Sequence, residues 1–198
     1  MSLTTSLILC NIVVFLAQGM LGSSLIAQFA LWPIGSVAIA GLDDPVGFRP
    51  WQLVTSAFLH GSTTHLVINM FALYMFGREV EARLGSARYA WMYGASVVTA
   101  AITQLLFVTA TGGFHPTVGA SGGVFGILLA FGYLFPERRV VLLFPPIPMR
   151  ARTFVILYGA MELLHGILGT QEGVAHFAHL GGMLGAWVVL WRWRRRAA

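Results

Sequence analysis

Six long apolar stretches, separated by polar connections, run through this sequence. A transmembrane helix needs about 20 consecutive, mostly apolar residues, and a shorter stretch is tolerated where a helix tilts or stops below the membrane surface. The stretches cover residues 5–27, 63–80, 88–110, 119–135, 153–169 and 174–192. They predict an all-α membrane protein in which residues 1–198 form one domain, a bundle of six transmembrane helices.

The first apolar stretch resembles a secretory signal peptide only superficially. No basic segment precedes it, and residues 18–24 make a poor cleavage site. We therefore expect this stretch to be retained as the first transmembrane helix.

The composition favours a membrane protein and argues against a nucleic-acid partner. Hydrophobic residues make up 57% of the chain and charged residues only 10%, whereas soluble domains carry about 25% charged residues. The net charge is +5, but all 12 basic residues are arginines gathered in short runs between apolar stretches. Such runs are typical of connections that set membrane topology rather than of a nucleic-acid-binding groove. Cys10 is the only cysteine, which excludes an internal disulfide and a thiol-rich metal site.

The arginines also predict the orientation of the helices. Only Arg49 lies in a connection on one side, while the other arginines lie in or beside the second and fourth connections and in the C-terminal tail. Because positively charged connections stay on the cytoplasmic side, both termini are predicted to be cytoplasmic. Basicity that comes from arginine alone and the compact architecture favour a bacterial protein of the cytoplasmic membrane.

The connection formed by residues 28–60 is the longest and lies on the opposite side. It is unusually aromatic for a solvated connection, with Trp32, Phe48 and Trp51. Because tryptophan side chains settle at the membrane interface, we expect a partly structured segment lying in that interface.

Polar side chains inside apolar stretches are costly in a membrane, so each requires an explanation. His65 and Asn69 lie four residues apart, hence on one face of the second helix, and His60 precedes them. Ser121 and His179 belong to the motifs GASGG and AHLGG, which open the fourth and sixth stretches. The predicted topology places these five side chains toward the same, non-cytoplasmic side.

A pairing of Ser121 with His179 is the simplest chemical interpretation, because serine becomes an effective nucleophile when a neighbouring base takes its proton. Both side chains are short, so their helices must approach closely. Two GxxxG motifs, which begin at Gly122 and Gly181, offer small faces for this approach. Phe125, one turn after the serine, is placed to pack under the imidazole.

A tetrahedral intermediate also needs hydrogen-bond donors directed at its oxyanion. The backbone N–H of Ser121, near a helix N-terminus, is one candidate donor. The side chains of His65 and Asn69 are the other candidates.

Several alternatives compete with this interpretation. A lone serine in a membrane helix usually serves packing, and a lone histidine near a helix end is usually interfacial. The sequence around Ser121 also matches the GxSxG elbow of soluble hydrolases, but that fold requires strands alternating with helices, and this sequence shows no such alternation.

Three further polar residues favour structural roles. Glu162 and His165 are three residues apart in the fifth stretch, and we expect them to satisfy each other or to face a water-filled rim. His176 and His179 form an HxxH pair, but a metal site needs three or four ligands and no carboxylate cluster joins the pair. We therefore predict neither a metal nor a cofactor, and an interfacial or supporting role for His176.

Taken together, the motifs resemble the rhomboid family of intramembrane serine proteases. The resemblance spans nearly the whole chain and consists of GASG at 119–122, AHLGG at 178–182, H-x4-H-x3-N over 60–69 and GREVEARLGS at 77–86. It implies a six-helix, cofactor-free protease that hydrolyses peptide bonds in or near transmembrane segments of other proteins in the lipid bilayer.

The resemblance also implies roles for individual residues. Ser121 would be the nucleophile, and His179 the general base and later the general acid. Support of the oxyanion and of the surrounding hydrogen bonds would fall to His65, Asn69, His60 and Gly119.

Outside the site, Glu81 and Arg83 resemble the family's structural pair at the cytoplasmic end. One departure is Gln52, which follows Trp51 where the family often has arginine. This departure leaves open how the first long connection is anchored.

Two non-protease functions remain as alternatives. A proton-relaying transporter would be expected to show repeat symmetry and matching broken helices, and the sequence has neither. A non-catalytic scaffold that binds transmembrane helices would be expected to lack Ser121 or His179, and both are present. The sequence carries no signal for an oligomeric state.

Overall fold

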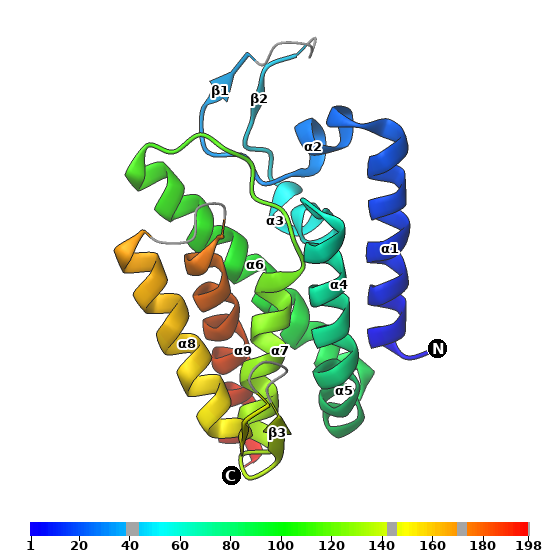
Figure 1. The fold of residues 1–198 in the computed structure, drawn as a ribbon, viewed down its shortest axis with the longest axis vertical. Coiled ribbons are helices and arrows are strands. Elements are labelled where there is room, and N and C mark those ends of the chain that lie inside the picture. Colours follow the sequence, from blue (N-terminus) through cyan, green and yellow to red (C-terminus); the bar gives the residue numbers. More distant parts are fainter. Residues whose placement is uncertain (39–43, 142–145, 170–173, 198) are drawn as a thin grey trace.

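The computed structural model describes residues 1–38, 44–141, 146–169 and 174–197, and helices dominate these residues (Figure 1). The α-helices are α1 Leu3–Leu21, α2 Ser23–Phe29, α3 Gln52–Thr55, α4 Thr63–Ala72, α5 Arg78–Leu84, α6 Ser86–Thr111, α7 Ser121–Leu134, α8 Ala151–Leu168 and α9 His176–Ala197. Two short antiparallel hairpins, β1 Ser36–Val37 with β2 Val46–Gly47 and β3 Arg139–Val141 with β4 Pro148–Arg150, lie in connections. The predicted all-α class is confirmed.

Helices occupy each of the six predicted stretches. Within the described residues, α1, α6 and α8 are long and apolar enough to cross a membrane, and α7 is a shorter apolar helix. The second stretch forms one continuous helix, because a π-helical turn over Leu73–Gly77 joins α4 to α5. The number of six membrane crossings stays a prediction.

The first predicted helix, residues 5–27, is wrong in its extent. Gly22 has a φ of +59° and ends α1, and α2 begins directly after it. A residue with a Cβ avoids this left-handed backbone, whereas glycine adopts it freely and commonly terminates helices.

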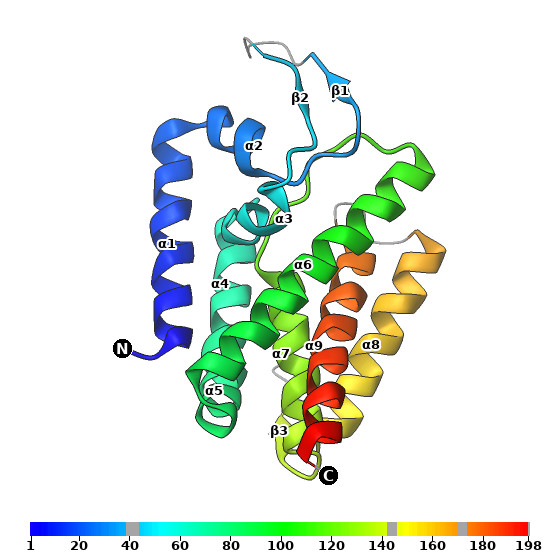
Figure 2. The same ribbon diagram turned by 180° about the vertical axis from the view of Figure 1, so that it is seen from behind.

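Glycines bring α6, α7 and α9 into close contact, and Figure 2 shows α6 crossing obliquely over the other two helices. A Cβ on Gly182 would overlap the backbone carbonyl of Gly122, so α7 and α9 touch at these two residues. Gly181 faces α6 instead, where a Cβ would meet Thr103 at 2.5 Å. The prediction that the two GxxxG motifs face each other is therefore wrong in part, because the second motif packs largely against α6.

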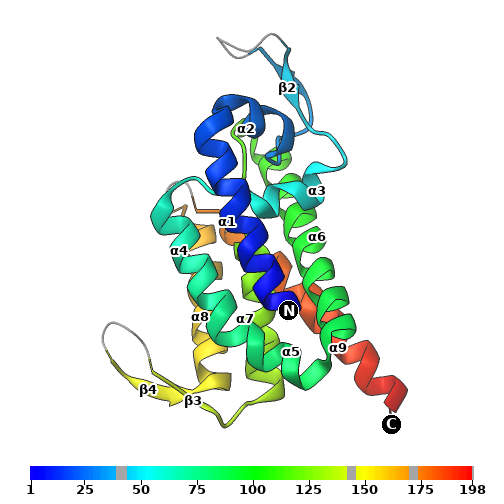
Figure 3. The ribbon, with the colours of Figure 1, turned by 90° about the vertical axis from the view of Figure 1, so that its right-hand side faces the viewer.

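Both termini lie at the same end of the bundle as α5 and the β3–β4 hairpin (Figure 1). The β3–β4 hairpin projects sideways from this end, whereas β1 and β2 lie at the opposite end (Figure 3). The arginine-rich connections therefore share one end with the two termini. This placement agrees with the orientation that the arginine distribution predicts.

Glu81 ties the start of α1 to α5. Its carboxylate accepts hydrogen bonds from the backbone N–H groups of Leu3 and Thr4, from the Thr4 hydroxyl, and from the Ser86 hydroxyl, at 2.7–2.9 Å. Burial alone would raise the pKa of this carboxyl, but these hydrogen bonds outweigh it and lower the pKa to about 2. The hydrogen bonds of Glu81 agree with the structural role that the resemblance implies for it, and among the described residues it forms no ion pair with Arg83.

Gln52 anchors the long connection between α1 and α4. Its Oε1 accepts from the backbone N–H groups of Trp32 and Arg49 at 3.2 and 3.1 Å, and its Nε2 donates to the carbonyls of Gln28 and Gly47. The side chain is fully buried, and a neutral amide supplies both the donors and the acceptor that this position needs. Gln52 therefore anchors the connection by its own hydrogen bonds, although the family often has arginine at this position.

The aromatic residues of this connection divide between two environments. Trp32 is buried in a small core with Ala30, Val46 and Leu59, whereas Trp51 is exposed. The prediction of a partly structured segment is confirmed for the described residues, while residues 39–43 of the connection lie outside them.

Candidate active site

Ser121 is the first residue of α7, and the backbone before it is unusual. Gly119 has a φ of +131°, and a Cβ at this position would lie 2.6 Å from Cε1 of His65. The Gly119 N–H donates to the Ser56 carbonyl at 3.0 Å, which fixes the turn. Glycine is thus required twice, for its backbone conformation and for the approach of the His65 ring.

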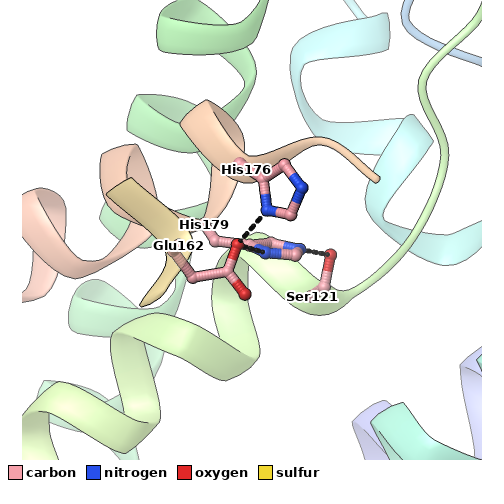
Figure 4. A network of polar contacts seen from close by, with 4 residues as sticks. All are labelled: Ser121, Glu162, His176 and His179. Atoms are coloured by element: carbon pink, nitrogen blue, oxygen red, sulfur yellow. Dashed lines mark hydrogen bonds and ion pairs between the residues drawn. The ribbon is translucent and has the colours of Figure 1, made fainter. Parts of the chain in front are cut away.

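Three helices place a chain of polar contacts around Ser121 (Figure 4). The Oγ of Ser121, on α7, lies 2.9 Å from Nε2 of His179, on α9. The Nδ1 of His179 lies 2.8 Å from Oε2 of Glu162, on α8, and Nδ1 of His176 lies 2.7 Å from the same oxygen. All four side chains therefore form one connected network.

Phe125 orients the His179 ring from below. The two rings are stacked, with centroids 4.1 Å apart and planes inclined by only 6°. The prediction that Phe125 packs under this imidazole is confirmed. Stacking of this kind restricts the ring to the plane in which its two nitrogens face Ser121 and Glu162.

A cavity of about 530 Å³ opens beside the serine. Its lining includes four of the predicted site residues, namely Ser121, His179, His65 and Asn69. The Nδ2 of Asn69 donates to the carbonyl of His65, one turn earlier in α4, at 2.9 Å. This bond leaves the second amide hydrogen of Asn69 available to a ligand in the cavity.

His60, unlike the other predicted side chains, is not part of the cavity lining. Its ring is buried, stands edge-on to the His65 ring at 5.1 Å, and has no hydrogen-bond partner on either nitrogen among the described residues. Burial, and then the proximity of His65, lower the pKa of His60 to about 4. Its backbone is held by Gln18 of α1 through two hydrogen bonds of 2.9 and 3.1 Å.

Sequence reasoning missed the position of Glu162. We expected this residue to pair with His165 or to face a rim, and did not expect its carboxylate to contact His176 and His179. The His165 ring stacks on His176 at 5.6 Å. The sequence reasoning found no carboxylate cluster beside the HxxH pair, but one carboxylate does join it, because ligand atoms of Glu162 and both histidines lie within 4.8 Å of one another. The available signal was that an acid inside an apolar stretch is functional by default.

Comparison with known proteins identifies the family. The model of the rhomboid domain matches residues 47–196, so the chain belongs to the rhomboid family. It is 32% identical over 154 residues to the presenilin-associated rhomboid-like protein A, mitochondrial, of Danio rerio, and 32% identical over 145 residues to rhomboid protein 1, mitochondrial, of Saccharomyces cerevisiae. It is also 30% identical over 135 residues to the rhomboid protease GluP of Bacillus subtilis.

These relatives are longer proteins. The aligned region covers 75%, 72% and 68% of this chain but only 40%, 41% and 24% of the three relatives, respectively. The chain is a membrane protein of this family. The predicted bacterial cytoplasmic membrane finds no support here, because the first relatives carry mitochondrial names.

Proposed function

We propose that this protein is an intramembrane serine endopeptidase that cleaves peptide bonds in or near transmembrane segments. The observation that carries the proposal is the 2.9 Å contact between Ser121 Oγ and His179 Nε2, in a cavity that His65 and Asn69 also line. Family membership and the named protease GluP among the relatives add support.

The proposed reaction begins with proton transfer. Nε2 of His179 takes the proton of Ser121, and Oγ attacks the carbonyl carbon of the scissile bond. The negative oxygen of the tetrahedral intermediate accepts hydrogen bonds from the backbone N–H of Ser121 and the side chains of His65 and Asn69. His179 then protonates the leaving amine. In the second half of the reaction His179 takes a proton from a water molecule, the water oxygen attacks the acyl carbon, and His179 returns the proton to Ser121 Oγ as it leaves.

The proposed substrate is a transmembrane segment of another membrane protein. A peptide bond inside a helix is shielded from attack, so the segment must unwind locally to reach Ser121. We therefore expect glycine, proline and other helix-weakening residues near the cut, and small residues beside the bond. The lining of the cavity includes apolar side chains such as Ile68, Phe71 and Ala72, which suit such a segment.

The first experiment compares wild type, Ser121→Ala and His179→Ala as detergent-purified proteins with a labelled transmembrane substrate. Loss of cleavage in both variants, together with loss of labelling by a fluorophosphonate probe, is the expected result. Thermal unfolding of each variant controls for misfolding. Cleavage by purified Ser121→Ala would overturn the proposal.

The competing function is a non-catalytic scaffold that binds transmembrane helices. Wild-type protein that binds the substrate segment but neither cleaves it nor reacts with the fluorophosphonate would favour the scaffold. The two functions are thus separated by the same set of proteins.

A further inference from the structure

We propose that Glu162 is a positioning residue for His179, so that the site is a Ser-His-Glu triad rather than a Ser-His dyad. The inference rests on the proposed function and adds a third residue to it. Its basis is the contact of 2.8 Å between Glu162 Oε2 and His179 Nδ1, on the side of the ring opposite Ser121 (Figure 4). Glu162 is only 13% exposed, so its contacts are shielded from bulk water.

The contact determines which nitrogen of His179 carries the proton. A carboxylate accepts hydrogen bonds and donates none, so Nδ1 of His179 must carry the hydrogen that it shares with Glu162. Nε2 then keeps its lone pair and accepts the hydroxyl proton of Ser121. The opposite tautomer would direct an N–H at the serine and would leave it without a base.

The carboxylate is itself held in place. His176 directs its Nδ1 at the same Oε2 atom from 2.7 Å, one turn before His179 on α9. Hydrogen bonds to a charged oxygen are about twice as strong as neutral ones. Glu162 therefore holds the His179 ring at its Nδ1 edge, and the stacked Phe125 ring holds it at its face.

The carboxylate also complements the reaction. After His179 takes the serine proton, its ring is an imidazolium, and a negative charge 2.8 Å away stabilises it. The hydrogen bond exists in the ground state, but the attraction between opposite charges arises only once His179 is protonated, so it favours turnover rather than substrate binding.

A metal ion is the main rival occupant of this cluster, since the three ligand atoms lie within 4.8 Å of one another. Donor atoms around a tetrahedral zinc lie roughly 3.3 Å apart, given Zn–N and Zn–O bonds of about 2.0 Å. The separations of Glu162 Oε2 from Nδ1 of His176 and of His179, 2.7 and 2.8 Å, are instead hydrogen-bond distances. Cleavage is therefore expected to be unchanged by a chelator, and loss of cleavage that zinc restores would overturn the proposal.

The primary test is Glu162→Gln, which keeps the shape of the side chain and removes its charge. We expect kcat for the labelled transmembrane substrate to fall about 10²- to 10⁴-fold with little change in KM, and fluorophosphonate labelling to slow in parallel. Glu137→Gln is the matched control, because the ion pairs that Glu137 forms within the described part of the chain, with Arg150 and Arg152, are exposed.

Chemical rescue distinguishes a Glu162 that positions His179 from a Glu162 that only stabilises the fold. In Glu162→Ala, added formate can occupy the vacated carboxylate position, and we expect it to restore part of kcat, whereas formamide should not. His176→Phe keeps the ring but removes the second hydrogen bond to Glu162. We expect it to retain more activity than Glu162→Gln and to show no formate rescue.

The outcomes distinguish this proposal from the proposed function. Wild-type cleavage that Ser121→Ala leaves intact would overturn the function itself. Wild-type cleavage lost in Ser121→Ala but unchanged in Glu162→Gln would overturn only the role of Glu162. A Glu162→Gln protein that fails to unfold cooperatively, with no formate rescue in Glu162→Ala, would assign the side chain to folding and would also overturn that role.

Discussion

Gly119 shows how one residue can serve the backbone and the site at once. Its φ of +131° turns the chain into α7, and its missing side chain leaves room for the His65 ring. Ser121 and the candidate oxyanion donor His65 are therefore brought together across a residue that has no functional group.

Replacement of Gly119 by alanine is expected to lower both stability and cleavage. A Cβ would strain the backbone by about 1–2 kcal/mol and would also displace His65 from the cavity. Cleavage and thermal unfolding measured on the same preparation check this expectation.

Gly112→Ala is the control for backbone strain alone. Gly112 also has a positive φ, +74°, but a Cβ there meets no atom within 4 Å. The control should lose comparable stability from strain and keep its cleavage rate. Equal activity losses in the two variants would contradict a specific role of the Gly119–His65 contact.

At the scale of elements, the distance between α7 and α9 decides whether Ser121 reaches His179. The two backbones touch at Gly122 and Gly182, one residue after the serine and three residues after the histidine. The side chains of the pair are too short to span a wider gap. If the helices moved apart by about the width of a methyl group, Ser121 Oγ and His179 Nε2 would lie beyond hydrogen-bond distance.

Gly182→Ala tests this element contact. The new methyl group would overlap the Gly122 carbonyl, and overpacking of this kind costs about 1–3 kcal/mol. We expect lower thermal stability and a large loss of cleavage, measured with the transmembrane substrate and the fluorophosphonate probe.

Gly94→Ala is the control for this test. Gly94 lies in α6, and a Cβ there meets nothing within 4 Å. Alanine at such a helical site should be neutral or stabilising by about 0.4–1 kcal/mol. Wild-type cleavage by Gly182→Ala would show that the helix separation is not critical.

At the scale of the whole molecule, side-chain hydrogen bonds connect segments at the two opposite ends of the bundle. Glu81 joins α1 to α5 at the end that carries both termini, and Gln52 anchors the long connection at the other end. The candidate active site lies between these two sets of hydrogen bonds.

Glu81→Gln is expected to destabilise the protein in a pH-dependent way. The folded-state pKa of Glu81 is about 2, below its ordinary 4.5, so its stabilisation is complete above about pH 4.5 and is lost as the pH falls through 2. Thermal unfolding should show a clear deficit for Glu81→Gln at pH 7 that becomes smaller at pH 3.

Glu79→Gln is the matched control, because Glu79 lies in the same helix and forms an exposed ion pair with Arg138. Such pairs contribute about 0–1 kcal/mol, so this variant should unfold near the wild-type temperature at pH 7. An equal deficit in both variants would contradict the special role of Glu81.

The features that depend on local pattern could be predicted from the amino-acid sequence. Apolar length predicted where helices lie, and the GASGG and AHLGG motifs indicated Ser121 and His179 as candidate site residues. The packing of Phe125 followed from its position one turn after the serine. The packing of Phe125 could be predicted because helical geometry relates residues three or four positions apart. Ser121 and His179 are 58 residues apart, so their pairing was inferred from the motifs and not from helical geometry.

Contacts between distant segments could be assigned only from the packing of the helices. Glu162 is 17 residues from His179, and Glu81 is 77 residues from Thr4, so no helical period connects either pair. The same holds for the GxxxG motif at Gly181, whose small face fits either α6 or α7 equally well by composition. Which neighbour a side chain meets depends on how the helices are packed in three dimensions, and the spacing of residues along one helix carries no information about that packing.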